Sequence, residues 1–128
     1  MSYYFTKTVQ GSFDQVIERV NAELKKEGFG VLTQIDVRET LKKKLDVDFP
    51  KYTILGACNP GFAHAALLAE NKIGTMLPCN VIVQEHENGE IEVSAVDPVL
   101  SMMAVQNDQL DNIAKEVRNK LQSVINSL

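Results

Sequence analysis

The pair Asn88–Gly89 constrains the fold of this 128-residue chain more than any other stretch, because it lies between two apolar segments. Asn-Gly is the preferred central pair of a two-residue type I′ turn. The flanking segments, 81–83 and 91–95, are rich in β-branched residues, which favour strands. We therefore predict two adjacent antiparallel strands joined at this turn, and a sheet that contains them.

The predicted turn also determines which residues face one another across the hairpin. With a two-residue loop, Asn80 faces Asp97 and Ile82 faces Ala95. Because side chains alternate along a strand, Asn80 and Asp97 then share one face of the sheet, and Cys79 points to the other. The Asn80 amide can donate to the Asp97 carboxylate or to a nearby turn carbonyl, and the pair would serve either as a structural latch or as a polar wall for a small ligand.

The rest of the chain alternates between strand and helix patterns. The predicted strands cover 2–9, 29–37, 52–57, 81–83 and 91–95, and the predicted helices cover about 12–28, 38–50, 59–71 and 108–124. Ser12 and Gln15 form a capping box for the first helix, and Gly28 ends it. Leu32 alone breaks the alternation of the second strand. The order β-α-β-(α)-β-α-β-β-α predicts an α+β fold, in one domain over residues 1–128.

Charge and hydropathy exclude two classes of partner. The net charge is −4 and the lysines are scattered, so no basic surface for nucleic acid is predicted. No apolar run approaches the roughly 20 residues of a membrane span, and the first ten residues lack the pattern of a secretion signal. We therefore expect a cytoplasmic protein with no membrane contact. In a reducing compartment its two cysteines stay as free thiols.

Both cysteines lie in similar triplets: Cys58 opens CNP, and Cys79 is the centre of PCN. Asn59 is a favoured N-cap residue and Pro60 suits the first helical position. A thiol beside a helix N-terminus is stabilised as a thiolate, so we predict that Cys58 is the more reactive cysteine unless burial outweighs this effect. Cys79 opens a strand with a packed face. Whether the thiols meet depends on strand order, which the sequence leaves open.

The sequence predicts no metal site. Twenty residues separate the two cysteines, which is far from the usual spacing of zinc ligands. Of the two histidines, His64 follows CNP on the predicted helix and is a candidate to face Cys58, whereas His86 lies among glutamates at the hairpin turn. No nucleophile elbow and no phosphate-binding glycine loop is present, so any cofactor and any reaction are left undetermined.

Five segments of the chain resemble the family catalogued as domain of unknown function 302. They are ILGACNP at 54–60, AHAAL at 63–67, IGTMLPCNVIV at 73–83, NGEIEVSAVDP at 88–98 and IDVRETLKKKLDVDFPKY at 35–52. The resemblance implies a two-layer sandwich with helices on one face of a largely antiparallel sheet, and a tendency to form homodimers. One sheet face would then lack helices, so we expect a symmetric dimer that buries the sheet or a closing loop.

The candidate site gathers the CNP, PCN and VDP motifs. Its predicted residues are Cys58, Asn59, His64, Cys79, Asn80 and Asp97. The leading hypothesis is a binding module for a small ligand or for thiol chemistry. The alternatives are a structural or interaction homodimer without chemistry, and a thiol-dependent enzyme of redox or sulfur chemistry. The deciding observation is whether Cys58 and Cys79 line one open pocket or are sealed in the core.

Overall fold

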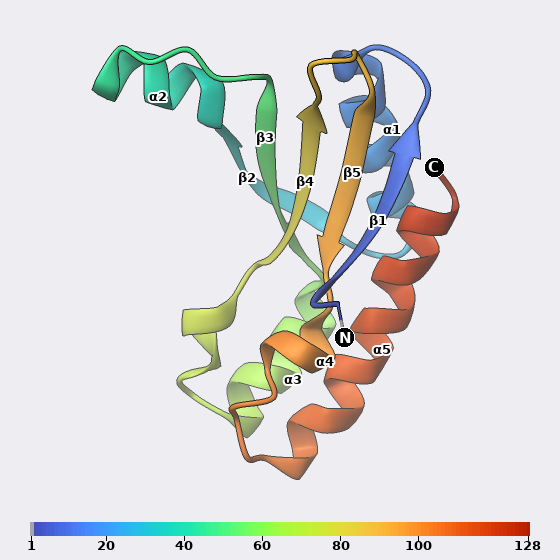
Figure 1. Cartoon of the computed structure of the whole chain (residues 1–128). Coiled ribbons are helices and arrows are strands. Elements are labelled where there is room, and N and C mark those ends of the chain that lie inside the picture. The colour runs from blue at the N-terminus through green and yellow to red at the C-terminus, as the bar shows by residue number, and fades with distance from the viewer. Residues whose placement is uncertain (1) are drawn as a thin grey trace.

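The computed structural model describes residues 2–128, which form a five-stranded antiparallel sheet with two of the helices packed on one face (Figure 1). In sheet order the strands are β1 (Tyr4–Val9), β5 (Ile91–Val96), β4 (Cys79–Glu85), β3 (Tyr52–Cys58) and β2 (Gly30–Asp36). The helices are α1 (Phe13–Lys26), α2 (Val37–Leu45), α3 (Pro60–Ala69), α4 (Pro98–Ser101) and α5 (Asp108–Asn126), with a short 3-10 helix η1 (Ile73–Met76). The predicted α+β sandwich is confirmed, and η1 and α4 are short additions to it.

Helices α1 and α5 cover one face of the sheet, and their apolar spacing explains this position. The buried residues of α1 recur every three or four positions, at Phe13, Val16, Val20 and Leu24. The capping box of α1 is present as predicted, because Gln15 N donates to Ser12 Oγ at 3.3 Å and Ser12 N donates to Gln15 Oε1 at 3.2 Å. No helix within residues 2–128 is long and apolar enough to cross a membrane.

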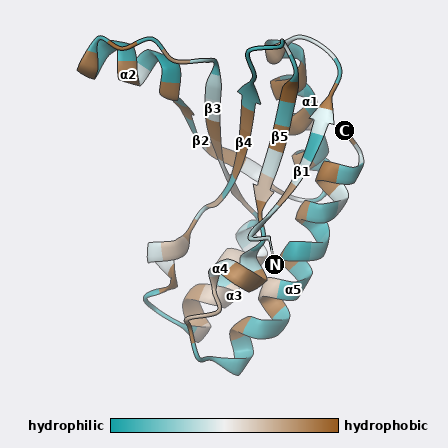
Figure 2. Cartoon of the chain, in the orientation of Figure 1, coloured by the Kyte–Doolittle hydropathy of each residue, from teal (hydrophilic) through white to brown (hydrophobic). Residues whose placement is uncertain are grey.

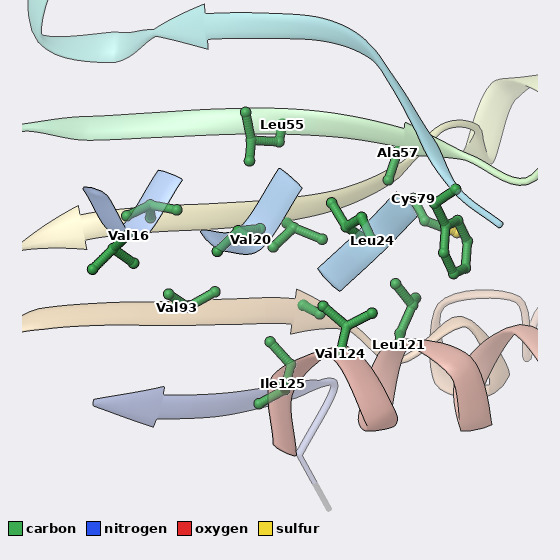
Figure 3. Packing of buried hydrophobic residues seen from close by; sticks show 14 of the residues in the cluster. Val16, Val20, Leu24, Leu55, Ala57, Cys79, Val93, Leu121, Val124 and Ile125 are labelled. Carbon is green, nitrogen blue, oxygen red and sulfur yellow. The ribbon is translucent and has the colours of Figure 1, made fainter. Parts of the chain in front are cut away.

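The main core lies between these two helices and the sheet. Figure 3 shows Val20 and Leu24 of α1 and Leu121 of α5 close to the strands. From the sheet, the largest fully buried side chains are Leu55, Val81, Val83, Ile91 and Val93. Burial of each such side chain contributes about 1.5–3 kcal/mol. Cys79 belongs to the same core, as its alternation with Val81 and Val83 predicts.

The β4–β5 hairpin exists, but its register differs by one residue from the prediction. Val81 pairs with Ala95, and Ile82 pairs with Ser94. The loop has three residues rather than two: Gly89 N donates to His86 O at 2.9 Å, and Gly89 has a φ of 86°. A turn followed by a left-handed glycine is the usual form of a three-residue hairpin loop, and the sequence Asn-Gly is compatible with it as well as with the two-residue loop.

A shift of one residue exchanges the faces of a strand, and it separates the predicted Asn80–Asp97 pair. Asn80 alternates with Cys79 and is exposed on the uncovered face of the sheet. Asp97 follows β5 and is buried. The predicted latch between Asn80 and Asp97 on a shared face is therefore wrong.

The second half of β2, α2 and residues 46–51 extend from the edge of the sheet as an arm (Figure 1). Val31 pairs with Ala57 and Thr33 with Gly56, so Leu32 is the extra residue of a β-bulge. This bulge explains why Leu32 breaks the alternation. The prediction of a buried face along the whole strand is wrong beyond Val31, because Thr33 and Ile35 are exposed and no helix among residues 2–128 covers them.

Candidate functional site

The antiparallel pairing of β3 and β4 brings the two Cys-Asn motifs together. Ala57 and Cys79 are directly paired, so Cys58 at the end of β3 is one residue from the partner of Cys79. Both cysteines are free thiols. The strand order that the sequence left open therefore places the thiols at one end of the sheet, where α3 begins and β4 starts.

Asn59 and Pro60 begin α3 as predicted, but the Asn59 side chain has another role. Asn59 is the N-cap residue with an extended backbone, and Pro60 occupies the first turn. The Asn59 side chain makes no cap hydrogen bond; its Nδ2 donates instead to Glu27 O at 3.4 Å. Asn59 thus ties the start of α3 to the turn after α1, and the expected side-chain cap is wrong.

Gly56 allows the segment before β4 to close over β3. A Cβ at Gly56 would overlap Thr33 Oγ1 and would lie 2.8 Å from Cγ of Pro78. Real Cβ atoms do not tolerate such contacts, so only glycine fits between the bulged strand β2 and the proline of PCN. Directly after Pro78, Cys79 begins β4 and pairs with Ala57 near the end of β3.

Cys58 and Cys79 line one cavity of about 280 Å³ between the sheet end, α3 and α5. Its inner wall is buried and includes Ala57, Ala66 and Val117 in addition to Cys79. Cys58 is half-buried. Both cysteines therefore contribute to one pocket and differ in burial, and the alternative in which both are sealed in the core is wrong.

The mouth of the cavity is formed by exposed apolar side chains. Leu32 of the bulge is 68 % exposed and Leu67 of α3 is 43 % exposed, and both line the cavity. Phe62 and Ala63, on the first turn of α3, are half-buried between the mouth and the inner wall. A bulge commonly redirects a side chain next to a binding site, and Leu32 fits that use.

Electrostatics separate the two thiols further. Burial raises the pKa of Cys79 from 9.0 to about 11, and the charge of a nearby Cys58 thiolate acts in the same direction. Cys79 therefore stays protonated near neutral pH. Cys58, which is nearer to solvent, is the thiol that a dissolved reagent can reach. The predicted greater reactivity of Cys58 agrees with this exposure and stays a prediction.

The remaining predicted site residues lie outside the cavity. His64 is on the exposed side of α3. Asn80 lines a shallow depression on the uncovered sheet face, beside Tyr52. Asp97 is buried where α4 begins: its Oδ1 accepts from Val99 N at 3.0 Å, and its Oδ2 lies 3.3 Å from Nε of Arg118. The structure therefore brings together Cys58, Asn59 and Cys79 of the six.

No cluster of three or more histidine, cysteine or carboxylate side chains suited to a metal occurs in the described part of the chain. His86, the second histidine, lies 3.2 Å from Oε1 of Glu92 near the hairpin loop. The cavity itself offers sulfur and amide groups and no charged side chain among residues 2–128. Its chemistry is thus that of an apolar pocket with two thiols.

Sequence reasoning missed the apolar residues that build the cavity. They are Leu32, Phe62, Ala63, Leu67, Ile113 and Val117, among others. Two signals were available. Leu32 broke the period of its strand, and the α3 segment PGFAHAALLA is apolar around most of its circumference, although only Ala66 in it is fully buried.

The family follows from a match along almost the whole chain. The family model described as "Domain of unknown function DUF302" matches residues 5–128. The chain belongs to the DUF302 family. Its structure is similar to the crystal structure of an uncharacterized conserved DUF302 protein from Bacillus stearothermophilus, with a TM-score of 0.91, 31 % sequence identity and 98 % of each chain covered. No match to the chain was found among curated proteins.

Proposed function

We propose that this DUF302 domain is a binding module for a small ligand, which it holds in the cavity where CNP and PCN meet. The observation that carries the proposal is a cavity of about 280 Å³ whose lining includes both cysteines, each a free thiol. A concave, largely apolar pocket with a few polar groups is the usual form of a small-molecule site. Cys58, half-buried, would face the ligand, and Cys79 would lie deeper in the site.

A thiol-handling role for the same cavity would depend on Cys58. Cys79 keeps its proton near neutral pH, since its pKa is about 11. Thiol-dependent catalysis, the alternative enzyme hypothesis, would therefore need Cys58 as its nucleophile. A reducing compartment such as the cytoplasm would keep both thiols free, which suits either role.

The binding proposal is tested by a fragment screen with amide NMR of the ¹⁵N-labelled protein. Fragments of several charge types are added, and we expect binders to shift the amide signals of Cys58, Phe62 and Val117, which surround the cavity. Native alkylation with iodoacetamide, read by peptide mapping, is the second readout: Cys58 should react first, and a bound fragment should slow it. A screen whose shifts never include these amides would contradict the proposal.

The second candidate function is that of a homodimer whose partner covers the arm and the uncovered sheet face. Figure 2 shows hydrophobic residues along the arm, and four of them are exposed: Ile35, Leu45, Val47 and Phe49. Tyr3 and Tyr4 are exposed beside the uncovered face.

Light scattering at micromolar concentration tests the dimer. We expect twice the chain mass of 14.2 kDa, because apolar surface of this extent needs cover. Leu45→Glu should shift the mass toward the monomer, because the charge would be buried in the interface. Leu68→Glu is the matched control: Leu68 is 76 % exposed on α3, away from the arm, and its replacement should leave the mass unchanged. A monomeric native protein would exclude the dimer.

A further inference from the structure

The cavity is more specific in its chemistry than a general small-molecule site. Within the described chain, its lining contains no lysine, arginine, histidine, aspartate or glutamate. The polar side-chain groups on its wall are the two thiols and the amide of Asn59, and that amide already donates to Glu27 O. A charged ligand would lose its hydration without gaining a counter-charge, which is costly.

The nearest buried charge is already neutralised. Asp97 precedes Pro98, which lines the cavity, but the Asp97 carboxylate is held by Val99 N and by Arg118. The N-terminus of α3 is the one feature of the wall that favours an anion, among the residues described. No basic side chain at this end of α3 would add to the attraction, and the rest of the wall is apolar, which disfavours an anion.

Small side chains keep the cavity open. Four alanines, Ala57, Ala63, Ala66 and Ala114, face the same space. A core selected for packing alone would fill such a space with larger residues, because each unfilled methyl-sized void costs about 1 kcal/mol. The unfilled space beside these alanines is therefore better explained as room for a ligand.

The volume limits the size of that occupant. An engineered apolar cavity of about 150 Å³ holds one benzene molecule, which has six heavy atoms. By proportion, about 280 Å³ has room for roughly eleven heavy atoms. We propose that the ligand of this cavity is a neutral, apolar molecule of roughly eight to twelve heavy atoms, such as a medium-chain alcohol or a two-ring aromatic; this rests on the proposed binding function.

The test compares two ligands that share a chain and differ in charge: 1-octanol and octanoate, titrated at pH 8 and followed by amide NMR. We expect octanol to shift the amides of Cys58, Phe62 and Val117 and to bind at least about tenfold more tightly than octanoate, because the carboxylate would be desolvated without a partner. Octanol should also slow the reaction of Cys58 with N-ethylmaleimide.

A pair of alanine variants on α3 assigns the binding to the cavity. Ala63→Leu places three more carbons inside it and should weaken octanol binding by about tenfold or more. Ala65→Leu makes the same change on the same helix, but Ala65 is exposed and does not line this cavity, so affinity should change less than about twofold. If Ala63→Leu does not fold, the protection of Cys58 by octanol in the native protein decides the question.

The outcomes separate this inference from the proposed function. Octanoate binding at the cavity amides as tightly as octanol, or more tightly, would overturn the neutral class and leave small-molecule binding intact. Binding of other charged fragments at these amides, without binding of octanol, would likewise overturn the neutral class and leave small-molecule binding intact. Equal affinity in Ala63→Leu and Ala65→Leu would show that octanol binds elsewhere, which also overturns the inference. If neither octanol nor any fragment shifts these amides, both proposals fail.

Discussion

Helices α1 and α2 have similar sequence signals and opposite environments. Each begins with a polar side-chain cap: Gln15 N donates to Ser12 Oγ in α1, and Glu39 N donates to Asp36 Oδ1 in α2. In α1, Leu24 is completely buried. None of the nine residues of α2, all of which the structure describes, is buried. A cap and an apolar spacing thus predict that a helix forms, whereas its burial depends on what lies opposite it.

The difference divides the molecule into a body and an arm. The body consists of β1, β5, β4 and β3 with α1 and α5, and the arm consists of β2 beyond the bulge with α2 and residues 46–51 (Figure 1). Regions with few buried apolar contacts open with less free energy than the whole fold. We therefore expect the body to set the free energy of unfolding and the arm to exchange its amide hydrogens quickly unless a partner covers it.

The largest expected effect compares one leucine from each helix. Leu24→Ala should lower the free energy of unfolding by about 2–5 kcal/mol, because it leaves a cavity in the core. Leu45→Ala, at a side chain that is 66 % exposed, should change it by less than about 0.5 kcal/mol. Both are measured by urea denaturation in protein dilute enough to be monomeric. A cost for Leu45→Ala close to that for Leu24→Ala would remove the distinction between body and arm.

The body was the part that the sequence predicted well. The capping box at Ser12 and Gln15, the end of α1 before Gly28, and the start of α5 at Asp108 are as expected. Each of these features depends on the residues at a helix end or on the apolar face of one helix. Both can be recognised from the sequence alone. The helix of the arm was also predicted, as a surface helix, although Val37 begins α2 rather than ending β2.

The predictions that failed depended on one residue of register or on a distant contact. Gly89 takes a left-handed conformation after a turn rather than within a two-residue loop, and the resulting shift of register puts Asn80 and Asp97 on opposite faces of the sheet. Asn59 was expected to cap its own helix, but its amide reaches Glu27 O at the end of α1. The sequence contains no local sign of that contact, because it joins residues 32 positions apart.

The second prediction uses Cys79 as a probe of burial in the body. Its pKa in the folded state is about 11, against the ordinary thiol pKa of 9.0, so the folded state holds this proton more tightly than the unfolded state does. The resulting stabilisation is complete below pH 9 and is lost as the pH rises through 11, by an amount of the order of 2 kcal/mol. Urea denaturation at pH 8 to 11 should show the decline.

Because tyrosines and lysines also titrate in this range, the measurement is a difference between variants. Cys79→Ala should have a flatter pH dependence than the native protein, whereas Cys58→Ala should keep most of the decline, since burial is the main cause of the raised pKa of Cys79. Parallel curves for Cys79→Ala and the native protein would mean that Cys79 is not shielded from water in the folded state.

The smallest expected effects come from removing the two helix caps, and they test the contrast between α1 and α2 at its local origin. Ser12→Ala removes the acceptor for Gln15 N and should lower the free energy of unfolding by about 1 kcal/mol, because α1 must be formed for the core to pack. Asp36→Ala removes the equivalent acceptor for Glu39 N, but α2 buries nothing, so its loss should cost the whole fold less than about 0.5 kcal/mol.

Hydrogen exchange distinguishes a local effect from no effect at all. In Asp36→Ala the amides of α2 should exchange several-fold faster than in the native protein, while the amides of α1 and α5 keep their rates, because the arm opens without unfolding the body. In Ser12→Ala the amides of α1 and of the strands beneath it should become faster together. If Asp36→Ala accelerated exchange in α1 as well, the arm and the body would unfold as one unit. The exposure of α2 would then not make the arm open independently of the body.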